Sequence, residues 1–78
     1  MLLDVLLISQ KEVILKAKAK SIVLCGEKGV FEILPFHKPI LSRLISGVIF
    51  IDNQAFSILR GIVSFSDNKA VIIVEKSP

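Results

Sequence analysis

The sequence of 78 residues has no tryptophan and no tyrosine, and it has only one cysteine and one histidine, Cys25 and His37. Acid–base or nucleophilic catalysis generally needs a titratable pair held within reach, and these two residues stand on separate segments with no evident orienting group. A zinc site is disfavoured because no paired Cys or His spacing is present. A lone cysteine cannot form an internal disulfide, so we expect Cys25 to be a small buried apolar side chain. We therefore predict no catalytic residue, no metal and no cofactor.

Long apolar runs are also missing. A membrane-spanning helix needs about 20 consecutive apolar residues, whereas the longest runs here, residues 5–8, 48–51 and 70–74, each end at a polar or charged residue. The N-terminus lacks the basic residues that begin a signal peptide, and it carries Asp4 where the apolar part of such a peptide would begin. We therefore expect no cleaved signal peptide. The chain is nevertheless 53% hydrophobic, with a mean hydropathy of +0.72, which exceeds the usual apolar content of soluble domains. We expect this excess to form a partner interface.

Short apolar runs separated by turn residues dominate the chain, and helical periodicity is almost absent. Asp52-Asn53 and Asp67-Asn68 tolerate left-handed backbone, so each is expected to close a hairpin. The stretch Gly26-Glu27-Lys28-Gly29 predicts a protruding loop and lacks the pattern of a phosphate-binding loop. Pro35 and Pro39 indicate a connection rather than a central strand. The predicted strands are residues 2–8, 11–17, 20–24, 30–34, 47–52, 55–60, 61–66 and 69–75, with 40–44 a shorter extended piece.

So many short strands in one small chain predict an all-β fold, an antiparallel β-sandwich of two packed sheets that forms a single domain over residues 1–78. Residues 16–20 alternate Lys and Ala, which is typical of a solvated strand whose lysines discourage edge pairing, or of a docking patch for acidic groups. Residues 48–51 and 70–74 are apolar on both faces, although only one face of each can enter the core. Loops of the same chain or another polypeptide must cover the other face, and the total apolar excess favours another polypeptide.

The net charge is +3, with ten basic residues interleaved among seven acidic ones. A small basic β-barrel that binds single-stranded nucleic acid is therefore the alternative interpretation. Such a module needs exposed aromatic platforms beside cations, and the five Phe residues of this chain are scattered over different strands and loops without interleaved Arg or Lys. We favour the protein-binding interpretation and expect no nucleic-acid partner.

Residues 30–41 read VFEILPFHKPIL. This segment resembles the signature of the epsilon subunit of F-type ATP synthases, in which a glycine-containing loop leads into a strand followed by Leu-Pro, one residue, His, one residue, Pro and two aliphatic residues. The resemblance extends over nearly the whole chain, to residues 21–24 and 47–49 and to the final hairpin at residues 60–71. The sequence departs from the family pattern at Cys25, where Pro is frequent, at Glu32 and Phe36, where Gly is frequent, and at Arg60, which replaces the first of a frequent Gly pair.

The resemblance implies a non-catalytic rotor subunit at the foot of the central stalk, linking the gamma subunit to the membrane-embedded c-ring and helping couple ion translocation to ATP synthesis. It implies a peripheral location at the cytoplasmic face of the inner or plasma membrane, with membrane contact only through the complex. Most relatives continue into an inhibitory helical hairpin. This sequence ends at residue 78, as a naturally short form or as a separated domain, and in both cases the inhibitory function is expected to be absent. The family pattern places the c-ring contact at Glu27, Lys28, Gly29 and Val30, and the gamma contact at Ser9, His37 and Ser42.

Overall fold

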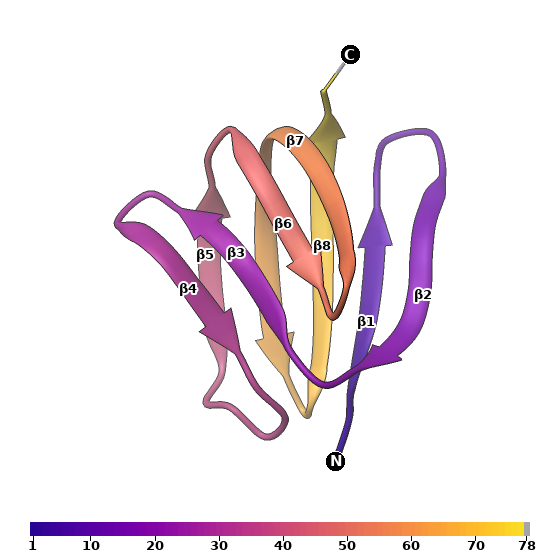
Figure 1. Ribbon diagram of the computed structural model, residues 1–78, viewed down its shortest axis with the longest axis vertical. Helices are drawn as coiled ribbons and strands as arrows, with labels where there is room; N and C mark the ends of the chain where they lie inside the picture. The colour runs from indigo at the N-terminus through magenta and orange to yellow at the C-terminus, as the bar shows by residue number, and fades with distance from the viewer. Residues whose placement is uncertain (78) are drawn as a thin grey trace.

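The computed structural model describes residues 1–77, and all of its regular structure is β-strand (Figure 1). The all-β prediction is therefore confirmed. No segment of the described chain forms a helix that could cross a membrane. The strands are β1 (Leu3–Ile8), β2 (Val13–Ala19), β3 (Ile22–Gly26), β4 (Gly29–Ile33), β5 (Ile40–Leu44), β6 (Gly47–Ile51), β7 (Gln54–Ser66) and β8 (Lys69–Lys76).

The strands form two layers that share the long strand β7. Its first part, residues 54–58, pairs with β6, and its second part, residues 61–66, pairs with β5 and β8. One layer therefore runs β2-β1-β8-β7-β5, and the other contains β4, β3, β6 and the beginning of β7. This arrangement confirms the predicted sandwich. Figure 1 shows β1 and β2 along one side of the molecule and β3 and β4 along the other.

Strand β7 differs from the prediction of two strands that meet between Arg60 and Gly61. The structure has one strand of 13 residues, and its pairing with β8 shifts register between Ile58 and Arg60. A strand can pass from one layer to the other by bending at such an irregularity, without a turn. Gly61 allows the close approach, because a Cβ at this position would lie 2.7 Å from the carbonyl oxygen of Ile73.

The pairing between β1 and β8 is the second difference from the predicted antiparallel arrangement. These strands lie parallel, with Leu6 beside Val71 and Ile8 beside Ile73, whereas the other pairs are antiparallel. Parallel neighbours need a long connection between them. Here nearly the whole chain between β1 and β8 forms that connection. The pairing of these two strands therefore cannot be predicted from a local sequence pattern.

The core lies between the two layers and is built from alternate residues of the strands. On β1 the inward side chains of Leu3, Val5 and Leu7 are each at most 2% exposed, and Phe65 of β7 is the largest fully buried side chain. No polar or charged residue of the described chain is buried. Full burial of each such Leu, Ile or Phe contributes roughly 1.5–3 kcal/mol to folding. Cys25 is also buried, as predicted, and its thiol donates to the carbonyl oxygen of Ile45 at 3.2 Å.

The turns at Asp52 and at Asp67-Asn68 have the left-handed backbone that the sequence predicted, with φ angles of 53°, 51° and 58°. The carboxylate of Asp52 accepts hydrogen bonds from the backbone N–H groups of Lys20 and Ser21, at 2.9 and 3.1 Å. These bonds hold the corner between β2 and β3. Strands β2 and β3 each begin two residues later than predicted, because residues 9–12 form a turn and residues 20–21 form this corner.

Candidate protein interaction surfaces

A row of apolar side chains crosses the outer face of the β2-β1-β8-β7 layer. Val13, Ile8, Ile73 and Ile62 occupy matching positions on these four neighbouring strands, and we call them the apolar row. Val13 is 60% exposed, Ile73 46% and Ile62 39%. The row ends at Arg43 on β5, which lies beside Ile62. Contiguous exposed apolar surface of this kind marks an interaction site more often than isolated apolar residues do.

The outer face of β6 is also apolar. Val48 and Phe50 are 41% and 44% exposed, and they alternate with the buried residues Ile49 and Ile51. The sequence analysis expected that the two doubly apolar strands would keep one face uncovered by their own chain. Ile73 on β8, together with Val48 and Phe50 on β6, confirms this expectation for the described residues.

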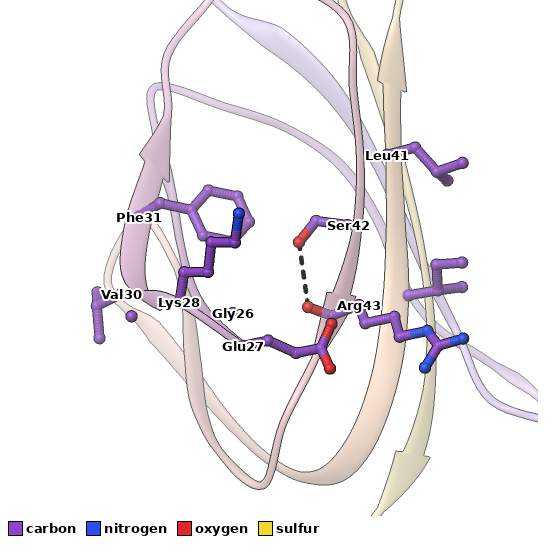
Figure 2. A pocket seen from close by; sticks show the side chains of 10 residues that line it. Gly26, Glu27, Lys28, Val30, Phe31, Leu41, Ser42 and Arg43 are labelled. Atoms are coloured by element: carbon purple, nitrogen blue, oxygen red, sulfur yellow. Dashed lines mark hydrogen bonds between the residues drawn. The ribbon is translucent and has the colours of Figure 1, made fainter.

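A groove of about 570 Å³ opens between the β3–β4 hairpin and β5 (Figure 2). It exists because β5 touches β3 at a single position, where Leu44 pairs with Gly26, and the two strands then diverge. Figure 2 shows Ser42 directed from β5 toward Phe31 and Lys28, whereas the side chains of Leu41 and Arg43 point away from the hairpin. The ring of Phe31 covers Gly26, since a Cβ on Gly26 would lie 2.8 Å from that ring.

The four residues predicted to contact the c-ring lie together at the tip of the β3–β4 hairpin. Glu27, Lys28, Gly29 and Val30 are all exposed, and Val30 is 74% exposed. Gly29 has a φ of 126°, which only glycine adopts readily. The hairpin therefore protrudes as predicted, and all four residues line the groove beside Ser42.

The three residues predicted to contact gamma are spread along the sandwich. Ser9 lies in the β1–β2 connection and His37 in the β4–β5 connection, at opposite ends of the view in Figure 1, while Ser42 lies on β5. The backbone of Ser9 donates to the carbonyl oxygen of Glu12 at 2.9 Å. The structure thus brings Ser42, but not the other two, close to the hairpin residues.

The loop that carries His37 is held by local hydrogen bonds and by one hydrogen bond to a distant residue, Asn68. His37 donates from Nδ1 to the carbonyl oxygen of Lys38 at 2.8 Å, and its ring stands edge-on to Phe65 with centroids 6.3 Å apart. Phe36 has a φ of 63°, and its N–H donates to Oδ1 of Asn68 at 2.8 Å. Phe36 thus adopts the left-handed backbone conformation that glycine, the residue frequent at this family position, adopts readily. The replacement of glycine by Phe36 therefore leaves this backbone conformation unchanged.

Asn68 is a connecting residue that the sequence analysis treated only as a turn former. Besides accepting from Phe36, its side-chain amide donates to the carbonyl oxygen of Leu2 at 2.9 Å, and its backbone oxygen accepts from Asp4 at 3.0 Å. The one sequence feature that indicated a connecting role for Asn68 was its polar side chain in the turn before the final strand. The partners could not be named from sequence because they lie more than 30 residues away.

The aromatic residues do not form the stacking surface that a single-strand nucleic-acid module needs. Phe65 is buried, and Phe31 and Phe56 pack against the core. The two exposed rings, Phe36 and Phe50, lie on the β4–β5 connection and on β6. A stacking platform requires neighbouring exposed rings beside cations, so this geometry gives the nucleic-acid interpretation no support.

Ion pairs on the surface are few among residues 1–77 and lie outside the groove. Lys76 contacts Glu12 at 2.8 Å and Arg60 contacts Glu75 at 2.9 Å. The hydrogen bond and the positive charge of Lys76 hold the pKa of Glu12 below its usual value. Exposed pairs of this kind contribute little to stability, so we assign them no part in recognition.

The fold and its surfaces define a small β-sandwich domain whose uncovered apolar face and protruding hairpin suit contact with other polypeptides. Its sequence matches the family model described as the ATP synthase, Delta/Epsilon chain, beta-sandwich domain, over residues 2–77. The chain belongs to this family.

Curated relatives agree with this membership. The chain is 32% identical over 74 residues to the ATP synthase epsilon chain of Campylobacter fetus subsp. fetus, and the match covers 88% of this chain and 57% of the relative. It is 31% identical over 77 residues to the ATP synthase epsilon chain of Leptospira borgpetersenii, covering 94% of this chain and 61% of the relative. The chain thus spans about 60% of the length of the curated relatives it matches.

Solved structures show the same fold. A chain in the central stalk and c-ring structure of the Tetrahymena thermophila mitochondrial ATP synthase superposes with a TM-score of 0.80 at 19% identity, and the match covers 94% of this chain and 63% of that one. A chain in the Euglena gracilis mitochondrial ATP synthase structure of OSCP, F1 and the c-ring gives a TM-score of 0.87 at 19% identity, covering 94% and 50%. At this identity the likeness concerns the fold.

Proposed function

We propose that this chain is a non-catalytic central-stalk subunit of an F-type ATP synthase, which links the gamma subunit to the c-ring and helps couple ion translocation to ATP synthesis. Family membership and the named epsilon-chain relatives support this assignment. Similar folds occur in a structure of a central stalk and c-ring and in a structure of OSCP, F1 and the c-ring. In this proposal residues 1–78 act as one unit, at the cytoplasmic face of the membrane and in contact with it only through the complex.

The observation that carries the proposal is the exposed apolar row on the outer face of the β2-β1-β8-β7 layer. A rotor part must hold its neighbours firmly, and burial of apolar area is the main favourable term in most protein association. The row offers apolar atoms on four adjacent strands. We assign this face to the gamma subunit, because a partner that covers the row would extend along the sandwich toward the loops of Ser9 and His37.

The β3–β4 hairpin is the proposed contact with the c-ring. Glu27 and Lys28 provide charges of both signs, and the exposed Val30 provides an apolar side chain at the tip. Polar loops of the ring could exchange hydrogen bonds and charge contacts with such a tip. This contact is small, so we expect it to specify position rather than to supply most of the affinity.

A co-elution experiment tests the proposal. Purified chain is mixed with the gamma subunit and passed over a size-exclusion column, and we expect the two to elute as one complex. Failure to co-elute, with both proteins folded, would contradict the central-stalk assignment.

Matched variants locate the gamma contact on one face. Ile73→Glu places a charge in the apolar row, and Val48→Glu places the same charge on the outer face of β6, where exposure is similar, at 46% and 41%. We expect Ile73→Glu to abolish co-elution and Val48→Glu to preserve it. The reverse result would assign gamma to the β6 face.

A further inference from the structure

The outer face of the β2-β1-β8-β7-β5 layer carries the excess positive charge of the chain. Because Val5 and Leu7 on β1 point into the core, alternation along the strand directs Asp4 and Leu6 outward. The pairing of the strands extends this face, and its charged residues are Lys16, Lys18, Arg43, Arg60, Lys69, Asp4 and Glu75. The excess of positive charge among them equals the net charge of the whole chain, +3. The charged residues elsewhere in the chain therefore cancel one another.

Some of the cations on this face form no ion pair within residues 1–77. Lys18 contacts Asp4 at 3.4 Å and Arg60 contacts Glu75 at 2.9 Å. The cations without an ion pair are Lys16, Lys69 and Arg43. The two acidic residues of the face are thus already matched by cations of this chain, and the remaining cations can bind carboxylates of another molecule.

The side chain of Arg43 belongs to the outer face and not to the β3–β4 hairpin. Gly26 pairs with Leu44, which places Glu27 opposite Arg43, yet no ion pair joins Glu27 to Arg43 in the described chain. In Figure 2 the guanidinium group of Arg43 points away from the hairpin. Arg43 therefore stands beside Ile62, at the end of the apolar row.

The cations without an ion pair border the apolar row on two sides. Arg43 lies one strand beyond Ile62, a step of about 5 Å, and a hollow of about 460 Å³ there is lined by Arg43, Ile62 and Ile73 among others. Lys69 precedes Ile73 by four residues on β8, which corresponds to about 13 Å along the strand. Lys69 and Lys16 line a second hollow, of about 530 Å³. The face thus has an apolar centre and a cationic border.

We propose that this face binds a polypeptide surface whose apolar centre covers the row and whose carboxylates contact Lys16, Lys69 and Arg43. An apolar centre with a polar rim is the usual anatomy of a protein interface, and arginine is enriched there. Arginine binds a carboxylate through two parallel hydrogen bonds, so Arg43 fixes the position of the partner next to Ile62. The charges of the border attract an acidic partner during its approach and disfavour a basic one.

The arrangement of charges fits a polypeptide better than a nucleic acid or a membrane. The apolar row separates Arg43 from the lysines, and Asp4 stands between Lys18 and Lys69, whereas a phosphate backbone follows a continuous line of cations. We take the partner to be the polypeptide that covers the apolar row. The inference rests on the proposed function for the identity of that polypeptide, the gamma subunit, and adds that gamma carries acidic residues around this contact.

The salt dependence of gamma binding tests the charge of the contact. The association rate of the unaltered chain with gamma is measured by surface plasmon resonance at several salt concentrations. Because salt screens the attraction between opposite charges, we expect the rate to fall at least about fivefold between about 0.05 and about 0.5 M sodium chloride. Failure of gamma to bind at any of these concentrations would overturn the stalk function and this inference with it. Binding at a rate that does not change with salt would overturn this inference alone.

Charge reversal at Arg43 locates the contact on the face. We expect Arg43→Glu to weaken gamma binding at least about tenfold. Lys20→Glu makes the same kind of change at an exposed site in the corner between β2 and β3, and it should leave binding within about twofold. An equal effect of both variants would show that only overall charge matters and would refute the proposed contacts. Circular dichroism checks that each variant folds, and if Arg43→Glu does not, Arg43→Gln replaces it with an expected loss of at least about threefold.

Carbodiimide cross-linking of the complex tests the lysine contacts directly. This reagent joins a lysine amine to a carboxylate that touches it, with loss of water. We expect mass spectrometry to find Asp or Glu residues of gamma joined to Lys16 or Lys69. A complex with gamma in which neither lysine is cross-linked, or in which only Lys28 or Lys38 is, would contradict the proposed border. Binding of the free chain to vesicles of phosphatidylcholine and phosphatidylserine that is tighter than its binding to gamma, and is lost in Arg43→Glu, would assign the face to a membrane surface and overturn the polypeptide partner.

Discussion

The side chain of Asn68 should stabilise this fold by joining two segments that are distant in the sequence. Its Oδ1 accepts from Phe36 at 2.8 Å and its amide donates to Leu2 at 2.9 Å, so it ties the β4–β5 connection to the N-terminus. It does this from a left-handed backbone with a φ of 58°. Each hydrogen bond contributes about 1 kcal/mol net, and an alanine in left-handed backbone costs roughly 1–2 kcal/mol. Asn68→Ala should therefore lower the free energy of unfolding by about 3 kcal/mol.

The matched variant Asn68→Gly separates the two causes. Glycine adopts the left-handed backbone without strain, so this variant should lose only the side-chain bonds, about 2 kcal/mol. Urea denaturation followed by circular dichroism measures both values, and thermal unfolding should shift by roughly 4–8 °C for each kcal/mol. If both variants unfold within about 0.5 kcal/mol of the unaltered chain, the two bonds do not hold the loops together and the reasoning is refuted.

Three further predictions concern strand packing, the hairpin tip and a surface ion pair. Gly61→Ala should lower the free energy of unfolding by roughly 1–3 kcal/mol in urea denaturation, because its Cβ would lie 2.7 Å from the carbonyl oxygen of Ile73; an unchanged midpoint would contradict the close approach. Val30→Glu should change the free energy of unfolding by less than about 0.5 kcal/mol, since Val30 is 74% exposed. The same variant should weaken binding to the c-ring in a pull-down. An unfolded variant would show instead that Val30 is needed for the fold. The pKa of Glu12 is lowered by Lys76, so its stabilising contribution is present above the unfolded pKa and is lost as pH falls through the folded pKa. An NMR titration of Lys76→Met should show the pKa of Glu12 rising toward its usual value, and an unmoved pKa would rule out Lys76 as the cause.

Features set by local chemistry were predictable from the sequence. Asp52 and Asp67 formed left-handed turns because their short polar side chains tolerate that backbone. The lysines and alanines of residues 16–19 alternate between exposed and less exposed positions because strand side chains have a period of two. The protruding hairpin followed from Gly26 and Gly29, and its placement needed no knowledge of the rest of the chain.

Features set by distant pairing were not predictable. The parallel pair of β1 with β8 joins the two ends of the chain. Strand β7 is continuous, and its pairing with β8 shifts register between Ile58 and Arg60. The groove depends on the point at which β5 leaves β3, and no residue type signals that point. The candidate contacts Ser9, His37 and Ser42 came from family resemblance alone, and their contact with gamma stays a prediction.

The central claim is that the apolar row on the outer face is buried by the gamma subunit. Calorimetric titration of gamma into the chain at several temperatures measures this directly, because burial of apolar surface gives a negative heat-capacity change on binding. We predict a clearly negative heat-capacity change for the unaltered chain, and a loss of binding or a much smaller change for Ile73→Glu. Tight binding with a heat-capacity change near zero, the same in both proteins, would contradict the claim.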